Sequence, residues 1–194
     1  KRLMIAVCAL GLLPLGAASA AEDRVEPVMG DDGLYHQTWF LNSFMVLEED
    51  LQEAADAGKR FAIVWEQKGC PYCKEMHTTN LAHPEVNDYV RENFLVLQLN
   101  LWGDRLVTDF DGEEMREKEL AQKYGVGFTP TIQFFPETPE GLADMKPRER
   151  EVFRMPGYFR PFHFIGAFHF VKSEYYEGEP NFQRYIMDMA NRER

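Results

Sequence analysis

Two cysteines, Cys70 and Cys73, have the residue type and the spacing that suit thiol chemistry. They follow an apolar run at residues 61–65, which is typical of a buried strand, and they open an expected helix. At a helix N-terminus the backbone N–H groups and the helix dipole stabilise a thiolate, the nucleophilic form of cysteine. Pro71 suits the first helical position because it has no N–H to leave unpaired. Cys73, one turn later, can attack a mixed disulfide on Cys70, so the pattern predicts thiol–disulfide exchange with Cys70 as nucleophile and Cys73 as resolving thiol.

The same pair of cysteines allows other interpretations. A structural zinc site needs four ligands, and His77 and His83 lie too close to the cysteines for the usual long intervening segment. A c-type haem site needs a histidine directly after the second cysteine, where this sequence has Lys74. We therefore expect neither a metal nor another cofactor. The alternatives are an inert pair, or a metal-binding or adaptor protein that uses Cys70 and Cys73 as ligands.

The N-terminus has the order of a secretory signal peptide. Two basic residues precede an apolar run at residues 3–15, and residues 18–20 fit an A-x-A cleavage site. The run is shorter than the roughly 18 apolar residues of a membrane-spanning helix, so an uncleaved anchor is the weaker alternative. We assign residues 1–20 to a signal peptide cleaved near Ala20, and we expect no stable membrane insertion after cleavage.

The predicted cleavage changes the meaning of the cysteine count. The third cysteine, Cys8, leaves with the peptide, so the exported chain keeps only Cys70 and Cys73. A bridge between residues this close restricts the unfolded chain little, because the loop that it closes is minimal. The pair therefore needs a chemical reason rather than a structural one.

Length and composition indicate one ordinary globular core. The chain has 194 residues, of which 45% are hydrophobic and 27% are charged. Its net charge of −11 argues against a nucleic-acid partner, because phosphate binding needs a basic surface. We expect an extended N-terminal arm at residues 21–40, followed by one domain at residues 41–194 that ends in a helical extension.

Hydrophobic periodicity and turn residues indicate an α/β domain in which strands and helices alternate. Strands are predicted at residues 61–65, 94–101, 131–135 and 151–155. Helices are predicted at residues 47–57, 70–80, 83–92, 113–124, 161–176 and 182–190. Residues 136–150, rich in Pro and Glu, are predicted to form an exposed, hairpin-like excursion between two strands.

A second motif, Thr129-Pro130, leads into the third predicted strand. A strand, a CxxC motif and a helix, followed later by Thr-Pro and another strand, resemble the thioredoxin superfamily over about residues 40–176. The resemblance implies a central mixed β-sheet of four or five strands flanked by helices. It also implies that Pro130 is a cis-proline beside the cysteines. The same resemblance places Thr129 and Pro130, together with Pro71 and Tyr72, against an extended segment of a partner protein.

Within the superfamily, the stretch from Glu66 to Cys73 and the nearby His77 resemble periplasmic SoxW-type thioredoxins and DsbD-gamma-like thiol:disulfide reductases. This resemblance implies a periplasmic enzyme that reduces disulfides of exported proteins, in sulfur oxidation or cytochrome c maturation. A membrane electron donor of the DsbD or CcdA type would restore the dithiol. The Cys-Pro-Tyr-Cys motif alone does not set the direction of electron flow, so a DsbA- or DsbC-like oxidase or isomerase is the alternative.

Glu66 is the candidate for moving the proton of the resolving cysteine. Thioredoxins have a buried Asp six residues before the first cysteine, where this chain has Val64. Glu66 lies two residues further along, on the same face of the strand. We hypothesise that Glu66 accepts and returns the proton of Cys73, and a solvated or ion-paired glutamate is the alternative. His77, one turn beyond Cys73, is interpreted as a residue of the helix face with no role in the chemistry.

Overall fold

The computed structural model describes residues 24–192. The predicted signal peptide and its cleavage point near Ala20 lie outside these residues. Between residues 24 and 192, no helix is both long enough and apolar enough to cross a membrane.

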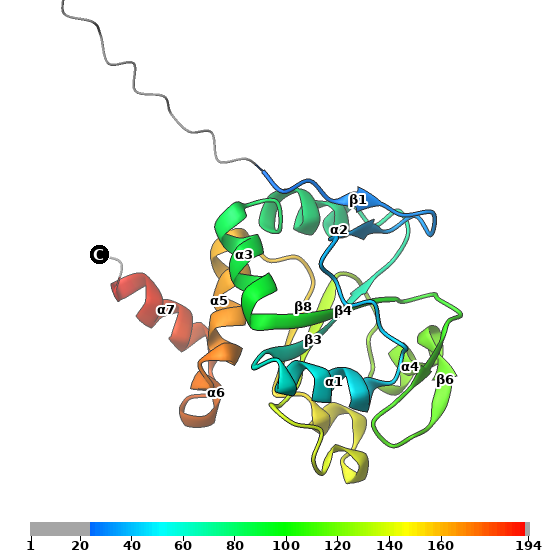
Figure 1. Ribbon diagram of the computed structural model, residues 1–194. Helices are drawn as coiled ribbons and strands as arrows, with labels where there is room; N and C mark the ends of the chain where they lie inside the picture. The colour runs from blue at the N-terminus through cyan, green and yellow to red at the C-terminus, as the bar shows by residue number, and fades with distance from the viewer. Residues whose placement is uncertain (1–23, 193–194) are drawn as a thin grey trace, which may run out of the picture.

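A four-stranded mixed sheet forms the centre of the fold (Figure 1). Its strands lie in the order β4 (Phe94–Asn100), β3 (Arg60–Glu66), β7 (Thr131–Phe134) and β8 (Phe153–Pro156). β3 and β4 are parallel, whereas β7 is antiparallel to both of its neighbours. All seven residues of β3 are buried, as expected for a central strand covered on both faces. The predicted α/β fold with a mixed sheet is confirmed.

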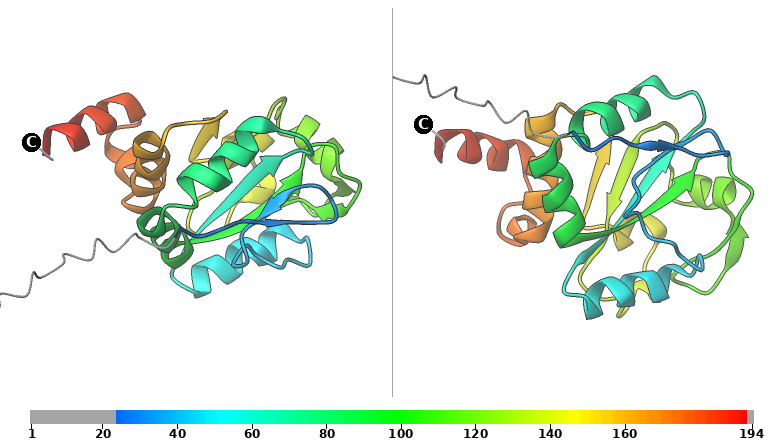
Figure 2. Two further views of the ribbon diagram at one scale, coloured as in Figure 1. Left: turned by 90° about the horizontal axis from the view of Figure 1, so that it is seen from above. Right: turned by 45° about the horizontal axis from the view of Figure 1, so that its top comes forward.

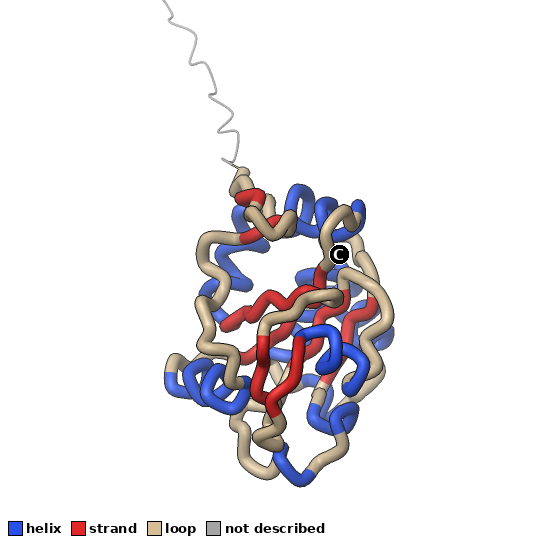
Figure 3. The backbone as a smooth tube through the Cα atoms, turned by 90° about the vertical axis from the view of Figure 1, so that its right-hand side faces the viewer, coloured by secondary structure: helices blue, strands red, loops and turns tan. Residues whose placement is uncertain are grey.

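Helices cover both faces of this sheet, and Figure 3 shows the strands together in the interior with helices and loops around them. On one face lie α1 (Leu47–Asp56) and α4 (Glu117–Lys123), whose apolar side chains share a core with β3 and β4. On the other face lie α3 (Pro84–Asn93) and α5 (Pro161–Lys172), which enclose a second, aromatic-rich core. The site at the end of β3 is therefore held by a sheet that is packed from both sides.

Two further helices follow α5 at the C-terminal end of the described chain. They are α6 (Tyr175–Gly178) and α7 (Phe182–Arg192). α7 packs on α5 (Figure 2), and Phe182 contacts Phe153 of the edge strand β8, with ring centroids 5.0 Å apart. The first residue of this helix thus contacts an edge strand of the sheet, while the helix itself packs on α5. The buried phenylalanines of α5 are Phe164, Phe168 and Phe170.

Residues 113–124 do not form the single helix that was predicted. Instead β6 (Glu114–Arg116) pairs antiparallel with β5 (Leu106–Thr108), and α4 begins after it. The Glu119 carboxylate accepts the backbone N–H of Arg116 at 2.8 Å, which closes the helix N-terminus as in a capping box. The prediction was wrong at this end because residues 114–116 pair with residues 106–108, and a helical pattern within one segment does not reveal such a pairing.

Residues 136–150 also differ from the predicted hairpin-like excursion. They contain two short 3₁₀ helices, η2 (Leu142–Asp144) and η3 (Pro147–Arg150). The Arg150 side chain is buried and its Nη1 lies 2.7 Å from Oδ2 of Asp109. The polar composition favoured full exposure, but this ion pair brings the end of the segment into the interior.

An N-terminal segment, residues 24–46, precedes α1. It contains the two-residue strands β1 (Val28–Met29) and β2 (Tyr35–His36), which pair with each other antiparallel. In Figure 1, β1 lies next to the helix that follows β3. Backbone hydrogen bonds from Val25 N to the Ala82 carbonyl and from Leu41 N to the Val96 carbonyl attach the segment to the domain.

Asp50 in α1 is a buried acid whose ionisation opposes folding. Burial raises its pKa to about 6, although the Ser43 hydroxyl donates a hydrogen bond to its carboxylate at 2.6 Å. The folded protein therefore binds this proton more tightly than the unfolded chain, in which the ordinary pKa is 3.8. The contribution to stability is complete below about pH 4 and is lost as the pH rises through the folded-state value.

Asp50→Asn should therefore raise the free energy of unfolding at pH 7 by up to about 3 kcal/mol. It should also remove the decline in stability between about pH 4 and pH 6 that Asp50 causes in the unmodified protein. Urea unfolding at a series of pH values measures both effects. Glu48→Gln, an exposed change in the same helix, serves as the control. A variant that keeps the pH slope of the unmodified protein would contradict the assignment.

Candidate active site

The two cysteines lie at the junction of β3 and α2 (Pro71–Glu75), as predicted. Gly69 has a φ of 75°, a left-handed conformation that glycine adopts without strain, and it turns the chain into the helix. Cys70 caps α2, and the backbone N–H of Cys73 donates to its Sγ at 3.0 Å. α2 continues directly into a π-helical turn, η1 (Met76–Asn80).

Cys70 and Cys73 form a disulfide in this structure. Their exposed fractions are small but unequal, at 7% for Cys70 and 2% for Cys73. An incoming partner sulfur therefore meets Cys70 first, while Cys73 is covered. This order matches the roles of nucleophile and resolving thiol that the spacing predicted.

The Thr129-Pro130 pair lies directly beside the first cysteine. Val64 pairs with Ile132 across β3 and β7, so the start of β7 is held next to the end of β3. The Thr129–Pro130 peptide bond is cis. The Thr129 hydroxyl donates to Cys70 Sγ at 3.3 Å, and the Thr129 carbonyl oxygen lies 3.7 Å from the same sulfur. Two motifs that are far apart in the sequence thus form one site.

Aromatic side chains, three of them exposed, lie in or next to the segments that form the site. Tyr72, which is 61% exposed, stacks on Tyr158 with ring centroids 6.1 Å apart. Phe128, just before the cis pair, is also exposed, and the exposed Trp102 donates its indole N–H to Gln67 Oε1 at 2.9 Å. Sequence reasoning singled out Tyr72 but missed Tyr158, Phe128 and Trp102, because each lies outside the CxxC and Thr-Pro motifs.

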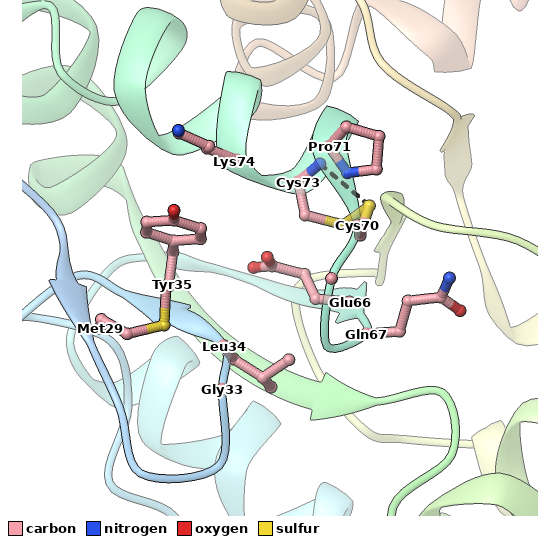
Figure 4. A pocket seen from close by; sticks show the side chains of 11 residues that line it. Met29, Gly33, Leu34, Tyr35, Glu66, Gln67, Cys70, Pro71, Cys73 and Lys74 are labelled. Atoms are coloured by element: carbon pink, nitrogen blue, oxygen red, sulfur yellow. Dashed lines mark hydrogen bonds between the residues drawn. A yellow bond between two sulfur atoms is a disulfide. The ribbon is translucent and has the colours of Figure 1, made fainter.

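Glu66, the last residue of β3, is fully buried beneath the disulfide (Figure 4). Its Oε1 accepts a hydrogen bond from Gln98 Nε2 at 2.8 Å and lies 2.8 Å from His77 Nε2. Its Oε2 has no hydrogen-bond partner among the residues that the structure describes. The burial is incompatible with a solvated glutamate. It leaves a carboxyl group that lines the same cavity as Cys73.

His77 is fully buried, and its ring contacts this carboxylate. His77 was expected on the helix face; the structure places that face in the interior, with the ring against Glu66. The helix changes from α to π geometry at Met76, so a wheel of 3.6 residues per turn does not place the side chains that follow. A histidine one turn after the CxxC motif was the available signal. The sequence does not indicate the π turn that carries its side chain into the interior.

A cavity of about 190 Å³ lies between the disulfide and the N-terminal segment (Figure 4). Met29, Leu34 and Tyr35 line one side of it, and Glu66 and Cys73 line the other. The buried carboxyl group and the resolving cysteine therefore share one small space. Sequence reasoning missed the contribution of the N-terminal segment, because two-residue strands carry no periodicity.

Metal ligation was one alternative for the cysteines. Across residues 24–192, no group of three or more His, Cys, Asp or Glu side chains is arranged to hold a metal ion. His77, one of the histidines considered as a ligand, has its two ring nitrogens within hydrogen-bond distance of Glu66 and Gln37.

A family model of the thioredoxin-like domain matches residues 47–172. The chain belongs to the thioredoxin-like domain family. The matched region of this thioredoxin-like protein contains Glu66, both cysteines, His77 and Pro130. The N-terminal segment that lines the cavity precedes it.

A search of solved structures finds similar chains. A thioredoxin-fold protein from Helicobacter pylori is 25% identical with a TM-score of 0.54, and the match covers 69% of this chain and 86% of that one. A thioredoxin from Thermus thermophilus is 25% identical with a TM-score of 0.44, over 62% and 79% of the two chains. The oxidised C-terminal domain of Neisseria meningitidis DsbD is 19% identical with a TM-score of 0.44, over 64% and 89%. A comparison with curated proteins finds no significant match.

Proposed function

We propose that this thioredoxin-like protein is a periplasmic thiol–disulfide oxidoreductase that reduces disulfides in exported partner proteins. The observation that carries the proposal is the Cys70–Cys73 disulfide at the start of a helix, with the Thr129-Pro130 motif beside it. The signal-peptide pattern of residues 1–20 supports export. The residues shared with SoxW-type thioredoxins support the periplasm as its compartment and reduction as its direction.

The reaction follows from the order of the two cysteines. The Cys70 thiolate attacks one sulfur of the partner disulfide, and the other partner sulfur leaves as a thiolate that takes up a proton. The Cys73 thiolate then attacks Cys70 Sγ, the second partner sulfur leaves, and the Cys70–Cys73 disulfide forms. The partner gains two electrons and this protein loses two, which produces the oxidised state of the present structure.

Glu66 accepts the proton that Cys73 loses when it attacks the mixed disulfide. Cys73 is buried and must lose its proton before it can attack, and Glu66 lines the same cavity. The carboxylate takes the proton from Cys73 Sγ as the thiolate forms. When the protein is reduced again, the carboxyl group returns the proton to Cys73.

The partner segment would bind on the side of Cys70 away from Glu66. Thr129 and Pro130 present backbone groups beside the sulfur, and Pro71 and Tyr72 lie on the adjoining turn of α2. We assign these four residues to contact with an extended stretch of the client. A membrane electron donor of the DsbD or CcdA type would then reduce the disulfide for the next cycle.

The reduction potential of the Cys70–Cys73 pair tests the direction. We expect a value near or below about −230 mV in equilibrium with a glutathione or dithiothreitol buffer, toward the thioredoxin end of the range. A value near or above about −150 mV would identify an oxidant and overturn the reductase proposal in favour of a DsbA- or DsbC-like enzyme. Insulin reduction without added metal checks catalysis itself. Failure of that assay, with a stoichiometric metal retained after purification, would favour the metal-binding or adaptor class.

A further inference from the structure

We infer that His77 is a positioning residue for Glu66: its ring donates a hydrogen bond to Oε1 and thereby confines the transferred proton to Oε2. The inference rests on the proposed function, because it concerns the proton step of disulfide exchange. It assigns a role to a residue outside the cysteine motif, and it explains why only one of the two Glu66 carboxyl oxygens is hydrogen-bonded within the described part of the chain.

The direction of the hydrogen bonds around His77 is determined by nearby groups that can only donate or only accept a hydrogen bond. The indole N–H of Trp39 can only donate, and it donates to Asn87 Oδ1 at 3.1 Å. The Leu81 carbonyl can only accept, and it accepts from Asn87 Nδ2 at 2.8 Å. Asn87 Nδ2 therefore also donates to Gln37 Oε1 at 3.1 Å. Gln37 Nε2 is then left to donate to His77 Nδ1 at 3.2 Å.

The hydrogen bonds to Glu66 have a determined direction as well. Because His77 Nδ1 accepts from Gln37, the ring proton lies on Nε2, which donates to Glu66 Oε1 at 2.8 Å. Gln98 approaches the same oxygen from β4. Its Nε2 donates to the Tyr35 carbonyl, which can only accept, and to Glu66 Oε1 at 2.8 Å.

Oε1 of Glu66 thus receives two hydrogen bonds, whereas Oε2 receives none from the described residues. A proton on Oε1 would face two N–H donors, so the neutral carboxyl group carries its proton on Oε2. Two donated hydrogen bonds also stabilise the ionised carboxylate, which is the form that accepts a proton from Cys73. His77 therefore helps to determine which oxygen of Glu66 exchanges the proton with Cys73.

The segment that orients His77 lies outside the region matched by the family model. Gln37 and Trp39 belong to residues 24–46, and Gln37 is buried. The other ionisable groups that line the cavity with Glu66 are Tyr35 of β2, Cys70 at the N-cap of α2, and Cys73 and Lys74 of α2. All four are unchanged in the variants below, so a difference between those variants reports on the group at position 77.

Two substitutions separate the contact with Glu66 from the contact with Gln37. In His77→Asn, the side-chain oxygen takes the place of Nδ1 and still accepts from Gln37, but no atom reaches Glu66. In His77→Gln, the longer amide places an N–H near the position of Nε2. The reduced protein is mixed with the chromogenic disulfide 5,5′-dithiobis(2-nitrobenzoate): the first thionitrobenzoate released reports attack by Cys70, and the second reports attack by Cys73.

In His77→Asn we expect the pH midpoint of the second release to rise by about one to two units, the size expected for loss of one hydrogen bond to a charged group. His77→Gln should restore the midpoint, and the first release should stay within about twofold in both variants, because it needs only a folded Cys70 site. Glu66→Gln should slow the second release at neutral pH. His169→Asn, at a half-buried histidine against Tyr89, serves as the control and should leave both releases unchanged.

An unmoved midpoint in His77→Asn, or equal shifts in the Asn and Gln variants, would overturn the inference. A second measurement needs no variant: ¹⁵N NMR of the unmodified protein at neutral pH should show a His77 ring protonated at Nε2 alone. A ring protonated at Nδ1 would overturn it as well. If the unmodified protein releases no thionitrobenzoate at all, the proposed function fails instead.

Discussion

Cys70→Ser is expected to lower the rate of insulin reduction by about a thousandfold or more, because the reaction then has no thiolate to attack the partner disulfide. Cys70 is the cysteine at the helix N-terminus, and it is the more exposed of the two sulfurs. A serine hydroxyl fits the same space but stays protonated at neutral pH. The loss should therefore appear in the rate, while the melting temperature of the reduced protein stays close to that of the reduced unmodified chain.

The matched control is Cys73→Ser. It keeps the nucleophile and removes the resolving thiol, so a mixed disulfide between Cys70 and the partner should accumulate. Mass spectrometry under non-reducing conditions detects this adduct. Accumulation of the adduct in Cys70→Ser rather than in Cys73→Ser would reverse the assigned roles. The trapped complex would also identify the client proteins.

Arg150→Ala is expected to cost about 3 kcal/mol or more of the free energy of unfolding, because it removes one partner of a buried ion pair. Arg150 donates to Asp109 at 2.7 Å, to Asp111 at 2.9 Å and to Tyr124 at 3.1 Å. Asp109 and Arg150 are both almost completely buried. Burial works against the charge of Arg150, but these contacts outweigh it and hold its pKa above the usual range.

Lys123 moderates this cost, because its ammonium group also lies 2.7 Å from Asp109. Urea unfolding measures the loss, and Arg148→Ala is the matched control. Arg148 is exposed, and Glu151 keeps its ion pair with Arg154 when Arg148 is replaced, so this change should cost no more than about 1 kcal/mol. Equal effects of the two substitutions would show that the cluster around Asp109 does not hold the segment at residues 136–150.

The buried ion pair between Arg150 and Asp109 explains why the polar composition of residues 136–150 led to the prediction of an exposed segment. Arg150 would be exposed in most proteins, and nothing next to it in the chain indicates an interior position. Its partner Asp109 lies 41 residues earlier in the sequence. A buried ion pair is a property of both residues at once, so it cannot be predicted from either one.

The sequence by itself determined the features whose causes are local. An apolar run followed by Gly69, Cys70 and Pro71 makes a buried strand that turns into a helix, because glycine permits the turn and proline suits the first helical position. The spacing of Cys70 and Cys73 sets one turn of helix between the two thiols. These features, with the Thr129-Pro130 motif, were enough to predict the thioredoxin-like fold and the exchange chemistry.

Only the tertiary structure decided what surrounds Glu66. Its partner Gln98 comes from the neighbouring strand, and His77 is reached through a π turn that breaks the helical period. Gln37, which orients His77, lies 40 residues before it in a segment with no periodicity. Each of these contacts joins polar groups that meet only when the chain has folded, and burial then makes an unpaired N–H donor costly. The pairing of the Gln98 and His77 donors with Oε1, rather than any local pattern, makes the two oxygens of Glu66 unlike.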